Sequence, residues 1–185
     1  MSIDQPLIVG EDGRHYTRLV WATPDGNVAH YDKRHLFRMA REQEHYAPGN
    51  RRLVVELKGW RLCPLVCYDL RFPVWSRSRG DYDVLLYVAN WPSRRRAAWS
   101  ALLRARAIEN VCYVVGVNRV GKDGNGASYS GDSVALDFLG QVLGGDRDGA
   151  FVETVVLDRE SLATFRRDFP VHLDADDFEL RADTK

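Results

Sequence analysis

The stretch Leu62–Trp75 reads LCPLVCYDLRFPVW and combines an apolar run with an abrupt stop. The run Leu65–Cys67 ends at a group of polar residues, and a proline follows soon after. Because Pro64 cannot donate a hydrogen bond to a neighbouring strand, we expect the ordered central part of a strand to begin at Leu65. This strand ends on a cysteine, at a position where a side chain can face a pocket.

Two interpretations of Cys67 follow from this position. Cysteine is among the most buried residue types, so an inert core thiol is the more frequent case. The alternative is a nucleophile at a sharp strand-to-turn junction, similar in logic to a nucleophile elbow, although the sequence has no GxSxG motif. A helix beginning just beyond Cys67 would favour the thiolate, and the backbone amide of Tyr68 could help to bind an oxyanion.

The rest of the chain alternates strand and helix patterns. Turn signals divide the N-terminal part into short strands; they lie at Asp12-Gly13, Pro24-Asp25-Gly26 and Lys58-Gly59. The run DVLLYVAN at 83–90 is typical of a strand that is buried on both faces. Residues 93–110 have apolar side chains at helical spacing, and we expect Ser93 to be the N-cap.

The C-terminal part predicts further strands and one more helix. Apolar runs at 111–120, 129–143 and 150–158 indicate strands, and a turn at Leu139-Gly140 interrupts the second of them. Asp158 can cap a helix that ends near Arg167, before a proline. Strands alternating with helices and followed by hairpins predict an α/β protein with a mixed sheet.

Composition excludes several classes of protein. The 185 residues suit one compact domain, and 26 basic side chains balance 26 acidic ones, so no overall charge favours nucleic acid or a membrane surface. No apolar stretch approaches the ~20 residues of a membrane span, and the N-terminus lacks a signal-peptide pattern. Three irregularly spaced cysteines argue against a disulfide framework. We therefore expect a cytoplasmic protein.

Metal and cofactor sites are not expected. Cys63 and Cys67 lie four residues apart on one strand, roughly 13 Å, which is too far for two ligands of one zinc ion. Cys112 lies in another apolar run and is expected in the core.

The segment HYDKRHLFRM at 30–39 is dense in chemically active side chains. A lysine such as Lys33 is most often a solvated surface residue. His35 is a possible general base for a Cys–His couple, which would place it within ~3 Å of Cys67. The sequence alone leaves both interpretations open.

Five blocks of this chain occur in the order and rough spacing of the carbon–nitrogen hydrolase (nitrilase) superfamily, and they resemble its bacterial omega-amidase branch most. The resemblance runs from about Leu7 to Phe178. The blocks are YDKRHLF (31–37), PLVCYDLRFPVW (64–75), LYVANWP (86–92), RARAIEN (104–110) and VNRVG with YSGDS (117–121 and 129–133).

The resemblance implies a Glu–Lys–Cys active site. Its motifs place the nucleophile on Cys67 and the lysine on Lys33, which would stabilise the thiolate and the oxyanion of the tetrahedral intermediate. A second glutamate of the family falls on Glu42, which would position the lysine and the substrate. His35 then becomes a structural residue. Trp91 is either a wall of the pocket or an ordinary buried aromatic residue.

The family's first glutamate, its general base, lies far upstream of the lysine. Only 32 residues precede Lys33 here, and the sole glutamate among them is Glu11, in an apparent turn. The resemblance therefore implies that about the first third of the family fold, with the base, is missing. Such a chain would be weakly active, unstable alone or stabilised by a partner, with an exposed sheet edge and uncovered apolar surface.

The resemblance also implies a fold and a substrate. We expect one partial domain over residues 1–185, with the four-layer α-β-β-α sandwich of the nitrilase type, in a protein that dimerises. The expected reaction is hydrolysis of the terminal amide of small 2-oxo acids such as 2-oxoglutaramate, without cofactor, metal, nucleic acid or membrane. Two alternatives remain: a catalytically dead subunit or binding protein, and a Cys–His hydrolase that uses His35.

Overall fold

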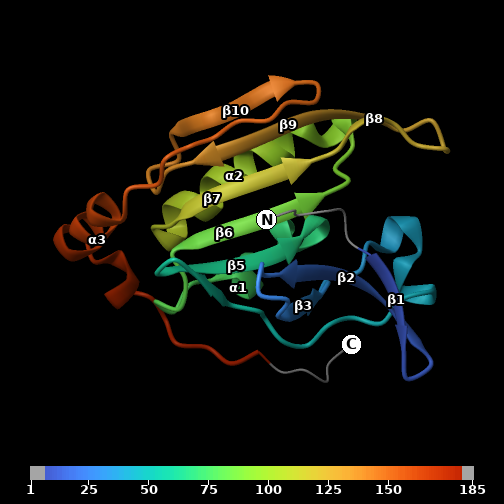
Figure 1. Ribbon diagram of the computed structural model, residues 1–185, viewed down its shortest axis with the longest axis horizontal. Helices are drawn as coiled ribbons and strands as arrows, with labels where there is room; N and C mark the ends of the chain where they lie inside the picture. The colour runs from blue at the N-terminus through green and yellow to red at the C-terminus, as the bar shows by residue number, and fades with distance from the viewer. Residues whose placement is uncertain (1–6, 181–185) are drawn as a thin grey trace.

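The computed structural model describes residues 7–180, and its strands form two sheets (Figure 1). The smaller sheet has the order β1-β2-β3, formed by β1 (Leu7–Glu11), β2 (Arg14–Ala22) and β3 (Val28–Asp32). The larger sheet has the order β10-β9-β7-β6-β5-β4, formed by β4 (Val55–Leu57), β5 (Trp60–Val66), β6 (Val84–Ala89), β7 (Tyr113–Asn118), β9 (Ser128–Leu136) and β10 (Val142–Asp148). A short strand, β8 (Val120–Lys122), pairs with β9 outside this path.

The helices are few, and short 3-10 turns fill many connections. The α-helices are α1 (Pro73–Ser76), α2 (Arg96–Asn110) and α3 (Arg159–Asp168). The 3-10 turns are η1 (Arg38–Ala40), η2 (Glu42–Glu44), η3 (Cys67–Arg71), η4 (Ser93–Arg95) and η5 (Val171–Leu173). Within residues 7–180, no helix has the length and apolar character needed to cross a membrane.

The centre of the larger sheet is parallel and its flanks are antiparallel, which confirms the mixed sheet. β5, β6 and β7 run parallel, whereas β4, β9 and β10 pair antiparallel with their neighbours. Every residue of β6 is buried, as its continuous apolar run predicts. Val66 pairs with Val88, so the carboxyl ends of β5 and β6 lie level. Ligands of open α/β sheets bind at such ends.

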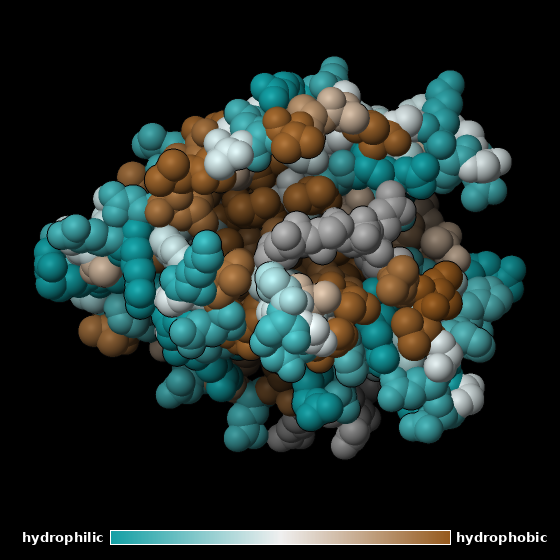
Figure 2. Space-filling view, viewed as in Figure 1, coloured by the Kyte–Doolittle hydropathy of each residue, from teal (hydrophilic) through white to brown (hydrophobic). Residues whose placement is uncertain are grey.

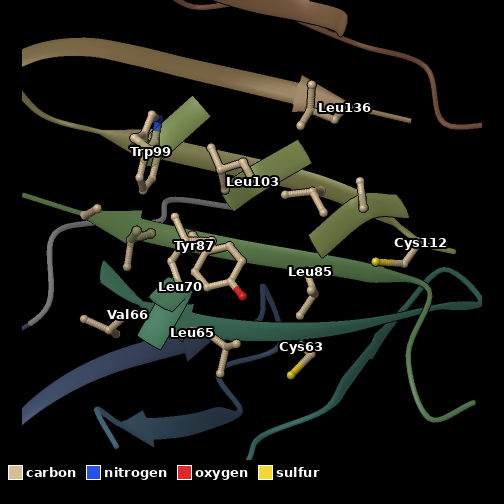
Figure 3. Close-up of a cluster of buried hydrophobic side chains, with 14 of the residues drawn as sticks. Cys63, Leu65, Val66, Leu70, Leu85, Tyr87, Trp99, Leu103, Cys112 and Leu136 are labelled. Carbon is tan, nitrogen blue, oxygen red and sulfur yellow. The ribbon is translucent and has the colours of Figure 1, made fainter. Parts of the chain in front are cut away.

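The main core lies between the larger sheet and α2, which lies behind it in Figure 1. Trp99 and Leu103 of α2 are fully buried, close to Leu85 and Tyr87 of β6 (Figure 3). They approach β7 closely because Gly116 has no side chain: a Cβ there would lie 2.6 Å from Leu103 Cδ1 and 2.8 Å from Trp99 Cζ2. Glycine at this position therefore sets the distance between helix and sheet.

The opposite face of the larger sheet carries apolar surface. Gly116 faces α2, so Val115 and Val117, its neighbours in β7, face the other way. Val115 is half-buried and Val117 is 39% exposed. Figure 2 shows apolar residues gathered over this face, while the residues around α3 are mostly polar. Apolar surface of the expected kind is thus present on the described part of the chain.

Local turn chemistry agrees with the sequence in most connections. Hairpins form at Asp12-Gly13 and Lys58-Gly59, where all four residues have positive φ. Asp158 caps α3, since its carboxylate accepts a hydrogen bond from the Ser161 amide at 3.0 Å. The predicted final helix is therefore confirmed, at 159–168.

Three local predictions are wrong. β5 begins at Trp60 and includes Pro64; β4 pairs only as far as Leu62, so a residue without an N–H is tolerated beyond that point. Ser93 caps no helix, because it opens the 3-10 turn η4 and α2 begins three residues later. Residues 150–158 form no strand.

We expect Gly116→Ala to lower the free energy of unfolding by about 1–3 kcal/mol, since the added methyl group overpacks the contact with α2. The matched control is Gly124→Ala, where a Cβ would meet no atom within 4 Å. Urea unfolding followed by circular dichroism measures both. Equal stabilities of the two variants would contradict the tight helix–sheet packing.

Candidate active site

A cavity of about 480 Å³ lies at the carboxyl ends of β5 and β6. Its walls come from the end of β5, the segment after β3, the segment after β6 and the β8–β9 hairpin. Five of the candidate residues from the sequence line it: Lys33, Glu42, Cys67, Tyr68 and Trp91. The structure therefore brings together side chains that are spread over almost sixty positions of the chain.

Cys67 occupies a sharp turn at the mouth of β5. It directly follows Val66, the last residue of the strand, and begins η3 with a φ of +45°, in the left-handed region. Its thiol lies 3.9 Å from the carbonyl oxygen of Asn90, beyond the level end of β6. A nucleophile elbow has a similar strand-to-turn geometry. The expected helix is missing, since only the 3-10 turn η3 and then the four-residue α1 follow.

The electrostatic environment of Cys67 has opposing parts. Burial raises the pKa of the Cys67 thiol, and the positive charge of Lys33 lowers it. The carboxylates of Glu42 and Asp69 raise it further, and the net pKa lies above the ordinary value. Because its pKa is raised, the Cys67 thiol is predominantly protonated at neutral pH. Lys33 is the nearby cation that favours the thiolate.

Lys33 is held in place by a partly buried ion pair. The lysine is 4% exposed, and its Nζ lies 2.7 and 3.0 Å from the two oxygens of Glu42. Glu42 also accepts a hydrogen bond from the Phe37 amide at 2.9 Å. Pairing and hydrogen bonding offset the cost of burying both charges. Lys33 is thus a fixed ammonium group rather than a solvated surface lysine.

The backbone around Lys33 is fixed as well. Its amide donates to the Thr17 carbonyl in β2, and its carbonyl accepts from the Gly49 amide, both at 2.9 Å. A Cβ on Gly49 would lie 2.1 Å from the backbone oxygen of Asp32. This close approach explains why glycine follows Pro48 at the end of the segment that carries Glu42.

A buried carboxylate joins the Lys33 segment to the Cys67 turn. Asp69 is fully buried and accepts four hydrogen bonds. Its donors are the hydroxyl of Tyr31 at 2.7 Å, the amide of His35 at 3.0 Å, Nδ1 of His35 at 2.8 Å and the amide of Val66 at 3.1 Å. Asp69 belongs to the CYDLRF motif, but no local sequence pattern predicts these contacts.

His35 has a structural environment. Its Nδ1 is engaged by Asp69, and its ring stacks on Phe72 with the ring centroids 3.8 Å apart. It lines a neighbouring cavity and is not among the residues that line the cavity of Cys67. This geometry favours a scaffolding role over that of a general base.

Trp91 is buried in the wall, with an exposed fraction of 3%. Asn118 fixes its backbone: the Trp91 amide donates to Oδ1 of Asn118 at 2.7 Å, and Nδ2 of Asn118 donates to the Trp91 carbonyl at 3.0 Å. The indole Nε1 donates to the carbonyl of Arg95 at 2.9 Å, and the guanidinium of Arg71 lies 5.2 Å from the ring centroid. Trp91 is both a core residue and a wall of the cavity, so the two sequence interpretations are compatible.

The described carboxylates that line the cavity are Glu42 and Asp123, and both have partners. Asp123 accepts hydrogen bonds from the Tyr129 hydroxyl and from the amides of two loop residues, all at 2.9 Å. The hydrogen bond from Tyr129 is the largest of the effects that lower the pKa of Asp123. Glu11 ends β1, lies 2.6 Å from the guanidinium of Arg18 and does not line the cavity.

The other two cysteines lie in the core. Cys63 and Cys112 are buried and free, and burial raises the pKa of Cys63 to about 12. Over residues 7–180, no group of three or more histidine, cysteine, aspartate or glutamate side chains is arranged to hold a metal ion.

Comparison with known proteins identifies close relatives. The family model described as carbon–nitrogen hydrolase matches residues 1–167. The chain is 54% identical over 164 residues to the omega-amidase YafV of Escherichia coli (strain K12), covering 88% of this chain and 64% of that protein. It is 34% identical over 161 residues to the 2-oxoglutaramate amidase of Bacillus subtilis (strain 168), covering 84% of this chain and 61% of that protein. The chain thus spans less than two thirds of the length of these curated relatives.

The fold of this chain is also similar to that of a solved structure. XC1258 from Xanthomonas campestris, a CN-hydrolase superfamily protein with an arsenic adduct in its active site, superposes with a TM-score of 0.93 and 51% sequence identity. The match covers 95% of this chain and 69% of that one. The predicted α/β sandwich fold of the nitrilase type is confirmed by this likeness.

We expect Lys33→Met to raise the pKa of Cys67 further, because the variant removes the cation that favours the thiolate. The rate at which iodoacetamide alkylates Cys67, followed by mass spectrometry from pH 6 to 11, would then rise at higher pH than in the wild type. Lys58→Met, in the exposed β4–β5 turn, should leave the profile unchanged. Coincident profiles for all three proteins would show that Lys33 does not act on the thiol.

Proposed function

This chain belongs to the carbon–nitrogen hydrolase family, and on that premise we propose that it is an amidase of the omega-amidase type. The proposed reaction converts the terminal amide of a small 2-oxo acid, such as 2-oxoglutaramate, to the carboxylate and ammonia. The observation that carries the proposal is that Cys67, Lys33 and Glu42 line one cavity, with Lys33 held by Glu42. Similarity to an omega-amidase and a 2-oxoglutaramate amidase supports it.

Acylation begins with Cys67. Its sulfur attacks the amide carbon, and the carbonyl oxygen becomes an oxyanion. The ammonium of Lys33 and the backbone amide of Tyr68 stabilise this charge. The C–N bond then breaks, the thiol proton is transferred to the nitrogen, and ammonia leaves a thioester on Cys67.

In deacylation, water is the nucleophile and the sulfur of Cys67 is the leaving group. Water attacks the thioester carbon, Lys33 again stabilises the oxyanion, and the C–S bond breaks to give the carboxylic acid and the free thiol. Glu42 keeps the lysine in place throughout. In the family the first glutamate carries the protons, an effect typically worth ~10²–10⁴-fold, and the resemblance matches no residue of this sequence to it.

An inactive subunit is the second candidate. The observation in its favour is that both described carboxylates of the cavity have partners, Glu42 with Lys33 and Asp123 with Tyr129. Against it stands the placement of Lys33, which Glu42 holds in the same cavity as the Cys67 thiol.

We also propose that the protein is cytoplasmic, as its three irregularly spaced cysteines indicate, and a homodimer, as its resemblance to the family implies. Light scattering coupled to gel filtration tests the assembly.

We expect the purified chain to release ammonia from 2-oxoglutaramate, and Cys67→Ala to lower kcat by at least about 10³-fold through loss of the nucleophile. An enzyme-coupled ammonia assay measures this. If the folded wild-type protein releases no more ammonia than Cys67→Ala, the inactive subunit is the better description.

We expect Lys33→Ala to lose about 10²–10³-fold in kcat because an oxyanion partner is removed. His35→Asn keeps a side-chain N–H for Asp69 and should retain most of the activity. The same assay measures both variants, with circular dichroism as a check of folding. The opposite pattern, with activity lost in His35→Asn and kept in Lys33→Ala, would establish the Cys–His alternative.

A further inference from the structure

The cavity has a surplus of positive charge in its described walls. Four cationic side chains line it, Lys33, Arg71, Arg94 and Arg95, against two carboxylates. Glu42 neutralises Lys33, and Asp123 is engaged by Tyr129, so the three arginines are the cations left to act on a bound molecule. A cavity of this charge favours anionic ligands.

Among these arginines, Arg95 is the least exposed to solvent. Arg71 and Arg94 are exposed, whereas Arg95 is half-buried. Its guanidinium carbon lies 5.3 Å from the ring centroid of Phe37, and its Nη2 lies 2.8 Å from the sulfur of Met39. Neither contact is with an anion, and a thioether is a weak acceptor.

Among the side chains that the structure describes, no carboxylate forms an ion pair with Arg95. A half-buried guanidinium loses part of its hydration, and this loss is normally offset by an anion. Arg96, next along the chain, shows the usual pattern, because its Nη2 lies 2.5 Å from Asp132. The planar fork of Arg95 therefore remains available for two hydrogen bonds to a carboxylate.

The backbone of Arg95 is fixed relative to the site. Its amide donates to the Pro92 carbonyl at 2.9 Å, and its carbonyl accepts from the Trp91 indole at 2.9 Å. Asn118 in turn holds Trp91 against the end of the sheet. The arginine thus approaches the cavity from an anchored main chain, as a recognition residue should.

We propose that Arg95 recognises the carboxylate at the far end of the substrate, so that the site selects amides whose acyl chain ends in a carboxylate. The inference rests on the proposed function and assigns the residue that makes the site specific. The reacting amide lies at Cys67 and Lys33, and the acid group pairs with Arg95 beside Phe37. The volume of about 480 Å³ suits a short dicarboxylic acid monoamide.

The test measures binding without requiring turnover. 2-Oxoglutarate, the product acid, should protect Cys67 from iodoacetamide, and the concentration giving half protection measures its affinity. Each variant is normalised to its own rate without ligand. We expect Arg95→Gln to weaken protection about 10- to 100-fold, the effect of losing hydrogen bonds to a charged group, and Arg95→Lys to have a smaller effect.

Arg94→Gln is the matched control, since it removes the same charge from a neighbouring, exposed position. It should change protection less than about threefold, the size expected of a screened surface charge. Arg71→Gln tests the third arginine in the same way. The inference is wrong if Arg95→Gln is protected as well as the wild type, if either other variant loses more, or if 2-oxoglutarate does not protect the wild type.

Turnover separates this inference from the proposed function. The ratio of kcat/KM for 2-oxoglutaramate to that for neutral butanamide should fall about 10- to 100-fold in Arg95→Gln and stay within about threefold in Arg94→Gln. Ammonia release with an unchanged ratio would uphold the amidase and overturn the role of Arg95. If protection depends on Arg95 but the chain shows no turnover, the role of Arg95 is upheld and the amidase is overturned.

Discussion

The site depends on the four hydrogen bonds that the carboxylate of Asp69 accepts. Its four donors come from two segments that lie 34 residues apart and that carry Lys33 and Cys67. A fully buried carboxylate is stable only when its lone pairs are satisfied, so the two segments must meet in one register. Tyr31 extends the network, because its hydroxyl also accepts a hydrogen bond from the Trp75 indole at 2.9 Å. The hydrogen bonds of Asp69 therefore fix the Lys33 segment and the Cys67 turn relative to each other.

Parallel strands supply the second constraint. Because β5 and β6 end level, the turn with Cys67 and the segment with Asn90 and Trp91 leave the sheet side by side. The thiol therefore meets a backbone carbonyl on one side, while the paired Lys33 lines the same cavity. Geometry of this kind holds the Lys33–Glu42 pair beside a thiol whose pKa is raised by burial.

Much of this arrangement could be predicted from local sequence. Turn residues, the buried run of β6 and the strand that leads to Cys67 follow from backbone chemistry. The five family blocks indicate Lys33 and Cys67, and the wider resemblance indicates Glu42. Contacts across long separations could not be predicted. Asp69 reaches His35 across 34 positions and Trp91 reaches Asn118 across 27, and no local pattern encodes either pair. The wrong predictions for Pro64 and Ser93 share this origin, since the neighbours of a residue decide whether a missing donor or a capping side chain matters.

The backbone of Cys67 has a consequence for how such a protein can change over generations. A side chain at a φ of +45° is strained, whereas glycine adopts this conformation freely. Selection for thermal stability alone would therefore favour glycine at the very position where the sulfur is needed. A substitution of Cys67 by glycine would stabilise the turn but remove the nucleophile. In a lineage that no longer needed the reaction, we expect Cys67 to be replaced early.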